Sequence, residues 1–318
     1  MTSPPSRPEP SSGNDTAAAG RRPRVAIVIV NYKGRDDTLE CLRSLSRLSY
    51  PGWDVFLVHQ PPDDGTADAV RASFGWVRQI ENRENNGFAG GNNVGIRAAL
   101  ALGADYLFLL NNDTVVEPGL LEPLVALAEG DPRIGVVGPK MLYHDPSNVV
   151  WSAGGGVDWR GRATRWGDGE PDRPGGEPRD VDYIVGCGLL VKREVLERVG
   201  LLDERYFLYF EETALCARVR EAGYRVVYQP AARLWHKVSR STGAESDLTL
   251  YYMRRNVLLY LGEHGARPFL GRLAALTDDL RLAAVWTLRG EHRRRRVLLR
   301  AVADYARGRF GKSRSAFT

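Results

Sequence analysis

The feature that most constrains this chain is an alternation of short apolar runs with segments of helical periodicity. Residues 25–30 form a continuous run of apolar, mostly β-branched side chains, as in strands buried on both faces of a parallel sheet. Residues 36–48 place leucines three positions apart, which puts them on one face of a helix. Repeated alternation of this kind predicts an α/β fold with an open, mostly parallel sheet flanked by helices. Further strands are expected over 54–58, 77–80 and 106–110, and further helices over 66–74, 89–102 and 118–127.

The second half of the chain is less regular. A Gly-, Pro- and Arg-rich loop is expected over 154–179, and loops of that length are usually functional or mobile. From Leu248 onward the pattern is helical and increasingly basic. Expected strands cover 134–137, 149–152, 183–185 and 224–228, and expected helices cover 193–199 and 212–222.

Composition divides the chain into three parts. Residues 1–23 are rich in Pro, Ser, Gly and Ala and lack the apolar core of a signal peptide, so we expect a disordered tail. A globular domain is expected over 24–245 and a basic helical extension over 246–318. The chain has no run of 18 apolar residues, which argues against a transmembrane helix, and its three cysteines show no CxxC spacing. The simplest setting is a reducing cytoplasm.

The net charge of +5 is unevenly distributed. Residues 266–318 carry 13 Arg and Lys against 4 Asp and Glu, a net +9, so the rest of the chain is close to −4. This distribution does not fit a uniformly basic nucleic-acid-binding protein. The basic run 293–296 is followed by an apolar helical stripe, which suits peripheral contact with the inner face of an anionic membrane. A solvated basic helix or a contact with a partner chain fits equally well. The stripe comprises Val297, Leu298, Leu299, Val302 and Tyr305.

Polar clusters follow three of the predicted strands, and open parallel sheets bind ligands beyond the carboxyl ends of their strands. Asp113, flanked by two asparagines, is a suitable ligand for a hard divalent cation that also binds phosphate oxygens. The alternative is that Asp113 caps the following turn. The three clusters are Asn31-Tyr32, residues 59–66 and residues 111–113.

Residues 84–93 combine three glycines with four asparagines just before a predicted helix. Glycines allow a ligand to approach the backbone closely, amides can recognise a base or ribose, and the helix N-terminus would point at the ligand. The segment has neither the Gly-Lys-Ser/Thr of a P-loop nor G-x-G-x-x-G spacing, which disfavours a dinucleotide oxidoreductase. A glycine-rich turn without a ligand is the alternative.

Paired carboxylates, Glu211 and Glu212, follow an aromatic run over 206–210. Aromatic rings give a sugar a stacking face, and crowding raises the pKa of at least one carboxyl group toward the range of a general base. Two charges that complement a helix dipole would give the same pattern. His236 is a candidate second ligand for a cation at Asp113, although a lone histidine is more often structural.

Together these motifs resemble glycosyltransferase family 2, and in particular its rhamnosyltransferase-like members, over residues 24–241. Each motif is weak alone, and their combination is specific. The matching segments are 28–32, 85–93, 110–113, Val181-Asp182-Tyr183, Gly186-Cys187, 201–207, Phe210-Glu211-Glu212 and Trp235-His236-Lys237.

The resemblance implies a GT-A fold for the globular domain and inversion at the anomeric carbon of the transferred sugar. It implies a nucleotide diphosphate donor, with dTDP-rhamnose favoured, and a glycan or lipid-linked acceptor in cell-envelope polysaccharide synthesis. A Mn²⁺ or Mg²⁺ cofactor would be bound by Asp113, His236 and Asn111. Glu212, with Glu211 beside it, would be the catalytic base. Expected donor-binding residues are Asn31, Tyr32, His59, Asp64, Asn85, Gly87, Gly91, Asn92 and Asn112.

Two departures from the family pattern bear on activity. The family usually has Val-Asp-Asn-x-Ser-x-Asp-Gly-Thr after the second strand; here the first Asp is His59 and the Asn is Gln60, whereas Asp64 is kept. The usual Glu-Asp-x-Asp-Leu has become Glu-Glu-Thr-Ala-Leu, so the base Glu212 is one methylene longer and the second Asp is Ala214. Misplacing a catalytic group by ~1 Å costs about 10²-fold in rate. A catalytically weakened or inactive nucleotide-sugar-binding scaffold is therefore the alternative function.

Overall fold

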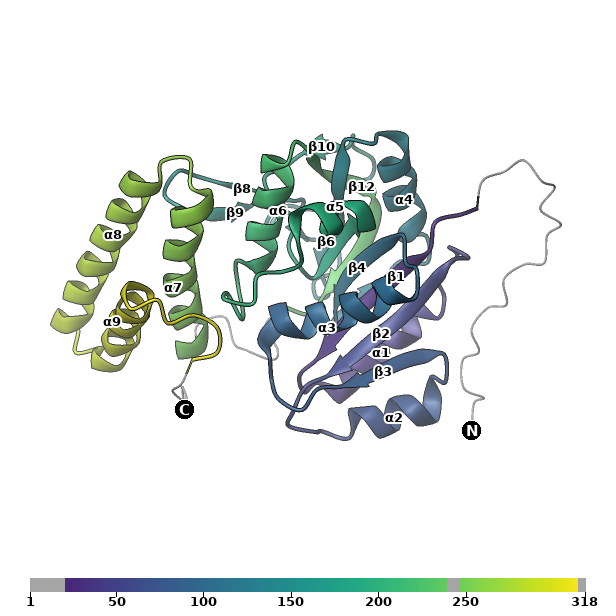
Figure 1. Ribbon diagram of the computed structural model, residues 1–318, viewed down its shortest axis with the longest axis horizontal. Coiled ribbons are helices and arrows are strands. Elements are labelled where there is room, and N and C mark those ends of the chain that lie inside the picture. The colour runs from purple at the N-terminus through teal and green to yellow at the C-terminus, as the bar shows by residue number, and fades with distance from the viewer. Residues whose placement is uncertain (1–20, 239–245, 314–318) are drawn as a thin grey trace.

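The computed structural model describes residues 21–238 and 246–313, which form a central sheet, flanking helices and a helical extension (Figure 1). The strands of the sheet are β1 (Val25–Asn31), β2 (Trp53–His59), β3 (Val77–Glu81), β4 (Tyr106–Asn111), β5 (Thr114–Val116), β6 (Ile134–Tyr143), β7 (Val150–Ser152), β10 (Arg179–Asp180), β11 (Gly188–Lys192) and β12 (Arg225–His236). Their order is β10-β12-β6-β11-β4-β1-β2-β3, with β5 paired to β12 and β7 to β6. Strands β1 to β4 are mutually parallel, and β12 runs parallel to β6. The predicted α/β fold is confirmed.

The helices that flank the sheet begin close to their predicted positions. They are α1 (Arg35–Leu45), α2 (Thr66–Ser73), α3 (Gly87–Ala101), α4 (Leu121–Gly130), α5 (Arg193–Val199) and α6 (Glu211–Glu221). Figure 1 shows α3 and α5 in front of the sheet, and α3 packs on β1, β2 and β4. The expected start of α4 at Pro118 is wrong, because the Pro118 carbonyl accepts hydrogen bonds from Ser49 and belongs to the preceding loop.

The end of the predicted tail is anchored to the domain. The Arg21 guanidinium pairs with Asp105 at 2.9 Å, and the Pro23 carbonyl accepts a hydrogen bond from Tyr50 Oη at 2.6 Å. Residues 21–23 therefore belong to the folded domain, and the rest of the predicted tail lies outside the described residues.

The strand predicted over 183–185 is wrong. Tyr183 makes an isolated bridge to Gly155, and Ile184 packs on Gly138, where a Cβ would lie 2.3 Å from it. The ladder instead begins at β11, which runs antiparallel between β4 and β6 with all five residues buried. An apolar run can fill the core without pairing, and hydrophobicity alone does not separate the two cases.

The sequence also underestimated two other regions of regular structure. The long loop contains a hairpin, β8 (Gly155–Val157) and β9 (Ala163–Arg165). Strand β12 continues eight residues beyond the predicted end at Tyr228, through an irregularity between Gln229 and Arg233. Pro230 occupies that irregularity, where a residue without an N–H breaks no ladder bond.

The extension consists of α7 (Asp247–His264), α8 (Pro268–Leu288) and α9 (His292–Ala306). The hairpin packs on it: a Cβ at Gly161 would lie 2.6 Å from Val257, and one at Gly271 would lie 2.7 Å from the Trp159 carbonyl. The domain boundary predicted after residue 245 adjoins 239–245, outside the described residues. Helix α7 nevertheless contacts α6 directly, so the first helix of the extension is part of the domain's packing.

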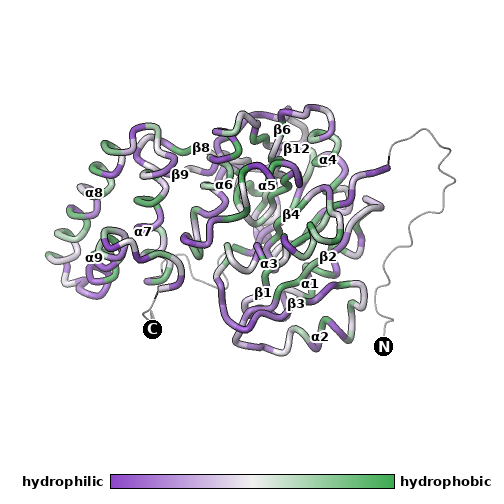
Figure 2. Tube along the Cα trace, in the orientation of Figure 1, coloured by the Kyte–Doolittle hydropathy of each residue, from purple (hydrophilic) through white to green (hydrophobic). Residues whose placement is uncertain are grey.

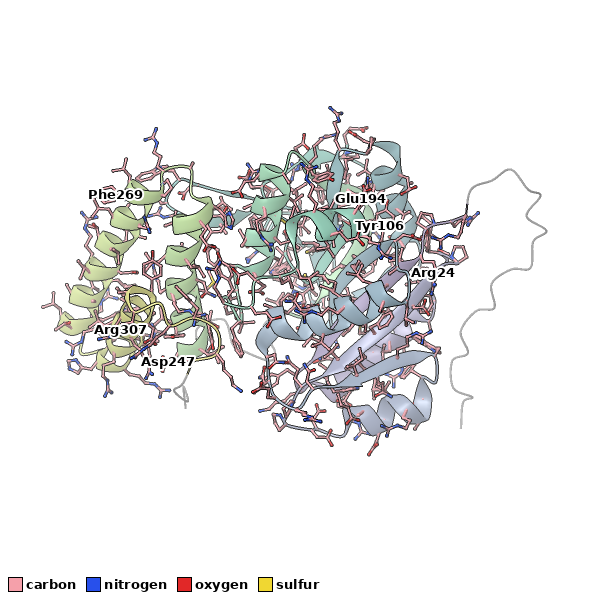
Figure 3. The ribbon with its side chains drawn as sticks, viewed as in Figure 1. Arg24, Tyr106, Glu194, Asp247, Phe269 and Arg307 are labelled. Carbon is pink, nitrogen blue, oxygen red and sulfur yellow. The ribbon has the colours of Figure 1, made fainter. Side chains whose placement is uncertain are left out.

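Part of the apolar stripe of α9 faces inward. Val297 and Leu298 are buried against the other two helices of the extension, whereas Leu299 is 45% exposed. Most of the exposed large apolar side chains of the extension lie on α8, where Figure 2 shows apolar residues interleaved with polar ones, and Figure 3 places Phe269 on the side away from the sheet. Among the described residues, no helix is long and apolar enough to cross a membrane. The exposed large apolar residues of α8 are Phe269, Leu270, Leu273, Leu280, Val285 and Leu288.

Candidate active site

The carboxyl ends of β1, β2 and β4 bring the predicted polar clusters together. Asn31 is in register with His59, and Val30 is in register with Asn111. Arg24 and Tyr106, labelled in Figure 3, mark the amino ends of β1 and β4, far from these carboxyl ends. The polar residues therefore share one edge of the sheet, as parallel pairing requires.

Asn112 joins the ends of β4 and β1. Its Nδ2 lies 3.2 Å from Asn31 Oδ1, 3.1 Å from the Lys33 carbonyl and 2.9 Å from Thr38 Oγ1. Asn31 Oδ1 also accepts a hydrogen bond from Thr38 Oγ1 at 3.1 Å. This network fixes the loop between β1 and α1 beside the end of β4, so Asn31, Tyr32 and Asn112 form one rim.

His59 continues this network toward β3. Its Nδ1 lies 3.4 Å from Asn31 Nδ2, and its Nε2 lies 2.8 Å from Gln79 Oε1. A neutral ring with its proton on Nε2 satisfies both partners, since it accepts from one amide and donates to the other. The imidazole is thus held between two amides where the family has a carboxylate.

Asp113 and His236 form a buried pair at the ends of β4 and β12. Asp113 Oδ1 lies 3.1 Å from His236 Nε2, and both side chains are at most 10% exposed. Asn111 Nδ2 lies 3.5 Å from the same ring nitrogen. Burial opposes the charge of Asp113, but His236 outweighs it and holds the pKa of the carboxyl below its usual value.

The pair fits a divalent cation only together with additional ligands. His236 Nδ1 is buried without a hydrogen-bond partner in the described part of the chain, and the ion-pair partner of Asp113 Oδ1 is the His236 ring itself; oxygen and imidazole ligands both suit Mn²⁺. The described residues contain no cluster of three His, Cys, Asp or Glu side chains that could hold a metal ion. The protein therefore offers one carboxylate, one imidazole and the Asn111 amide, leaving phosphate oxygens of a ligand to complete the coordination sphere.

Lys237 explains why His236 lies where it does. Its Nζ contacts Asp37 Oδ1 at 2.5 Å and Glu40 Oε2 at 2.6 Å, both on α1. The Lys237 N–H donates to the Asp113 carbonyl at 3.0 Å. The end of β12 is thus tied to both α1 and the Asp113 backbone, which fixes the imidazole beside the carboxylate.

Glu211 and Glu212 are the first two residues of α6. Burial raises the pKa of Glu211 well above its usual value, and the charge of Glu212 raises it further. Burial also raises the pKa of Glu212, which backbone N–H groups, including that of Gly186, partly offset. Glu211 therefore keeps its proton longer, and Glu212 is the carboxylate available to accept one.

The segment Gly186-Cys187 connects the glutamates to the Asp113 pair. A Cβ at Gly186 would lie 3.5 Å from Glu212 Cβ, and the Cys187 carbonyl accepts a hydrogen bond from the Asn111 N–H at 3.4 Å. Burial raises the pKa of the Cys187 thiol, with further contributions from the charges of Asp113 and Glu212. Asp113 and Glu212 are thus both close enough to Cys187 for their charges to act on its thiol.

A turn of unusual backbone conformation precedes the glutamates. Phe207, Tyr209 and Phe210 have positive φ angles of 66°, 69° and 74°, which cost non-glycine residues about 1–3 kcal/mol each. The fully buried Asn256 of α7 donates from Nδ2 to the carbonyls of residues 206, 208 and 209 at 2.8–2.9 Å. Arg255, also fully buried, donates to the carbonyls of residues 205 and 206. The extension therefore holds the strained turn that aims Glu212.

The glycines of the 84–93 segment serve packing. A Cβ at Gly87 would lie 2.2 Å from the Phe207 carbonyl, and one at Gly91 would lie 2.9 Å from Val30. The first N–H groups of α3, from Phe88 and Ala89, donate to that same Phe207 carbonyl. The expectation that this helix N-terminus faces a ligand is wrong, because protein already occupies it.

The remaining predicted donor-side residues have local partners. Asn92 is buried and donates to the Phe88 carbonyl at 2.9 Å. Asp64 Oδ1 accepts from the Thr66 N–H at 3.2 Å, at the start of α2, and Asn85 Oδ1 accepts from the Gly87 N–H at 2.8 Å. These bonds shape the loops that border the site.

Ala214, which replaces the second Asp of the family pattern, packs in an apolar cluster and not at the sheet edge. Ala214 is 1% exposed and belongs to an apolar cluster with Tyr206, Phe210 and Tyr260. An Asp at this position would be buried among these rings, so its replacement by alanine removes no group from the sheet edge.

Three residues of the site were missed in the sequence, and a fourth, Gln60, was noted only as a departure from the family pattern. Gln60 ties β2 to α3 by accepting from the Asn86 N–H and donating to the Gly87 carbonyl, and the Trp151 ring packs on His236 with centroids 4.5 Å apart. Arg255 and Asn256 carried a usable signal, since two polar residues on the inward face of an apolar helix require buried partners.

Comparison with known proteins gives consistent relatives. The family model described as "Glycosyltransferase like family 2" matches residues 23–258. The N-acetylglucosaminyl-diphospho-decaprenol L-rhamnosyltransferase of Mycobacterium tuberculosis is 28% identical over 290 residues, 83% of this chain and 89% of the relative. The dTDP-rhamnosyl transferase RfbF of Shigella flexneri is 23% identical over 188 residues, 56% of this chain and 60% of that protein.

Solved structures share the fold at low identity. The mannosyltransferase PcManGT from Pyrobaculum calidifontis, in complex with GDP-Man and Mn²⁺, has a TM-score of 0.57 and 17% identity, covering 90% of this chain and 88% of that chain. GalNAc-T7 with UDP, GalNAc and Mn²⁺ has a TM-score of 0.63 and 17% identity, covering 81% of this chain and 52% of that chain.

Proposed function

Because this chain belongs to the glycosyltransferase-like family 2 and is a glycosyl transfer enzyme with a GT-A fold, we propose that it transfers rhamnose from dTDP-rhamnose to a lipid-linked glycan. The setting would be the synthesis of cell-envelope polysaccharide. Support for this donor and acceptor comes from the similar relatives, a decaprenol-linked rhamnosyltransferase and a dTDP-rhamnosyl transferase.

The observation that carries the proposal is the pairing of Asp113 with His236, to which the segment Gly186-Cys187 connects Glu212. Asp113, His236 and Asn111 would hold Mn²⁺ or Mg²⁺ together with the donor diphosphate. The cation would neutralise the charge that develops on the departing nucleoside diphosphate. The donor's nucleoside would lie along the rim formed by Asn31, Tyr32 and Asn112. His59, Asp64 and Asn85 border this rim, and Gly87, Gly91 and Asn92 support it from behind.

Glu212 acts as general base in this mechanism. An acceptor hydroxyl oxygen attacks the anomeric carbon while the bond from that carbon to the diphosphate oxygen breaks, so the configuration inverts. The hydroxyl proton moves to Glu212, and the electron pair of the broken bond leaves with the nucleoside diphosphate. Protonated Glu211 keeps the negative charge of the pair on Glu212.

Residues 266–318 would contact the membrane that carries the acceptor, from its cytoplasmic side. Helix α8 is the element best suited to this contact, because its outer face exposes Phe269, Leu273 and Leu280. Arginines 267 and 289 flank the helix, and Arg281 lies within it. Basic residues beside an exposed apolar face favour binding to anionic lipid surfaces.

Nucleotide release tests the assignment. The purified protein is incubated with Mn²⁺ and a panel of nucleotide sugars, with and without lipid-linked acceptors, and nucleoside diphosphate is quantified. We expect release from dTDP-rhamnose that requires both Mn²⁺ and acceptor and is lost in Asp113→Ala. Metal-dependent release that persists in Asp113→Ala would refute the cation site, and donor binding without any turnover would identify a nucleotide-sugar-binding scaffold.

A further inference from the structure

A cavity of about 530 Å³ lies between the β8–β9 hairpin, α7, α8 and the start of α9. The residues assigned above to the donor and the cation do not line it. Much of its wall is apolar, and Met253 within it is 38% exposed. The apolar lining comprises Phe210, Leu250, Met253, Val257, Ala275 and Trp286.

Four arginines converge on the same cavity from different elements. Arg160 and Arg162 come from the hairpin, Arg254 from α7 and Arg294 from α9, whereas Asp278 is the one acidic residue among the lining residues. Such convergence concentrates guanidinium donors that can bind phosphate oxygens in pairs.

Ion pairs neutralise these arginines only in part. Arg160 and Arg162 share Asp278, at 3.8 Å and 3.4 Å. Arg254 pairs with Asp279 at 3.1 Å, and Arg294 pairs with Glu291 at 3.5 Å. Asp278 also pairs with Arg281 at 3.7 Å, so three arginines share this one carboxylate, and Arg160 Nε is buried without a hydrogen-bond partner in the described structure. The cavity is therefore suited to an anion with an apolar portion.

One end of the cavity lies at the turn that precedes α6. Phe210, in its wall, is followed in the chain by Glu211 and Glu212. The cavity then extends along α7 to α8, whose inner side contributes Ala275 and Trp286 and whose outer side is the exposed apolar face. A molecule in this cavity would lie between that turn and the exposed face of α8.

We propose that this cavity binds the diphosphate-lipid portion of the acceptor. The guanidinium groups of Arg160, Arg162, Arg254 and Arg294 bind the phosphate oxygens, and the hydrocarbon chain lies against the apolar wall. This inference rests on the proposed function for the identity of the acceptor, and it adds the residues that select a lipid diphosphate over a neutral glycan.

Binding of farnesyl diphosphate to the full chain, measured by titration calorimetry without donor, tests the cavity directly. The variant is Arg162→Gln/Arg294→Gln, because both side chains are partly exposed and their removal leaves no buried charge. The matched control is Arg71→Gln/Arg193→Gln, which removes two arginines that form comparable surface ion pairs elsewhere. We expect the cavity variant to raise the Kd at least about 10-fold, the effect of losing roughly one charge-assisted hydrogen bond, and the control to leave the Kd unchanged.

Transfer kinetics give the second readout. The cavity variant should raise KM for a diphosphate-lipid-linked sugar by a similar factor, while KM for the donor and transfer to a neutral alkyl glycoside stay as in the unmodified protein. Equal Kd values for the cavity variant and the unmodified protein would overturn the proposal. The proposal would also be overturned if the cavity variant lost binding only to phosphatidylglycerol vesicles and not to farnesyl diphosphate, because the arginines would then contact the bilayer surface. Arginine-dependent binding of farnesyl diphosphate without transfer to any lipid acceptor would support the cavity and refute the proposed function.

Discussion

At the scale of single residues, the two adjacent glutamates are distinguished by their surroundings. Burial and the charge of Glu212 raise the pKa of Glu211, whereas backbone N–H groups partly offset the effect of burial on Glu212. Two carboxyl groups so close cannot both be charged at low cost, so one keeps its proton. Their chemical roles therefore differ although their side chains are identical.

This difference predicts that the two amide substitutions change the rate to very different extents. Glu212→Gln removes the proton acceptor and should lower kcat by about 10²–10⁴-fold with donor affinity unchanged. Glu211→Gln mimics the protonated carboxyl and should stay within a few-fold (~3) of the unmodified rate, because the charge distribution is preserved. Steady-state transfer and donor titration check both; equal loss in the two variants would contradict the assignment.

The raised pKa of Glu212 also fixes the direction of the pH dependence. A base must be deprotonated, so the rate should be full above the raised pKa and fall as the pH drops through it. The fall should occur at a higher pH than the ordinary pKa of a glutamate. A kcat profile that stays flat down to the ordinary value would exclude Glu212 as the titrating base.

At the scale of elements, α7 does more than cover the domain. Its Asn256 donates to three carbonyls of the strained turn before α6. Asn256→Ala would leave these carbonyls short of donors and let the turn relax, at a cost of about 2–3 kcal/mol in the free energy of unfolding. Because the turn aims Glu212, we expect kcat to fall about 10–100-fold while KM for the donor is unchanged.

A control on the same helix separates positioning from stability. Leu258 is fully buried and packs toward Leu261 and Ala275 in a separate cluster from the turn. Leu258→Ala should cost a similar about 2–5 kcal/mol and, measured below its unfolding temperature, should keep its kcat. Equal losses of kcat in the two variants would show that Asn256 acts through stability alone.

Helix α8 gives a separate test of membrane contact. Leu273 and Leu280 are 52% and 66% exposed, so replacing both with Gln should leave the fold intact. Each leucine inserted into the interface contributes about 1 kcal/mol or more, so the double variant should bind phosphatidylglycerol vesicles at least about 10-fold more weakly. Leu102→Gln, at a 48% exposed leucine of the sheet domain, is the control. Flotation that is equal in all three proteins would reject α8 as the contact.

At the scale of the whole molecule, most strands of the sheet were predictable, including the starts of β6, β7 and β12, whereas β11 was not. The apolar runs of β1, β2 and β4 alternate with amphipathic helices along the chain, so local pattern determines them. Strand β11 inserts between β4 and β6, which are remote from it in sequence, and the neighbouring residues 183–185 are equally apolar without pairing. Burial by distant elements decided between the two segments.

The site divides in the same way. Asp113 and the glutamates were predicted because carboxylates at the ends of strands and helices stand out in a sequence. The glycines of the 84–93 segment were predicted to approach a ligand, and the structure gives them a packing role; a sequence does not separate the two, since both require a missing Cβ. Asn256 lies outside every recognised motif, and its partners are backbone carbonyls that no sequence pattern marks.

Stability against pH provides a test of how the extension is packed. Asp279 of α8 is 3% exposed, and neither of its carboxylate oxygens has a hydrogen-bond partner among the described residues, although Arg254 lies 3.1 Å away. Burial raises its pKa to about 6, with Arg254 opposing the shift. An acid whose folded-state pKa is raised contributes stability below its unfolded pKa and loses that contribution as the pH rises through the folded value.

Asp279→Asn should therefore stabilise the protein above pH 6 and have its smallest effect well below the ordinary pKa of 3.8, where the carboxyl is neutral in both the folded and the unfolded state. The partly exposed Arg254 and solvent screening reduce the effect to about 1–2 kcal/mol. The difference in the free energy of unfolding between the variant and the unmodified protein cancels the titration of all other groups, so denaturant titrations of both proteins across this range isolate Asp279. A difference that stays constant from below the ordinary pKa of 3.8 to above 6 would mean that the pKa of Asp279 is not raised, and that its ion pair with Arg254 offsets the cost of burying its charge between α7 and α8.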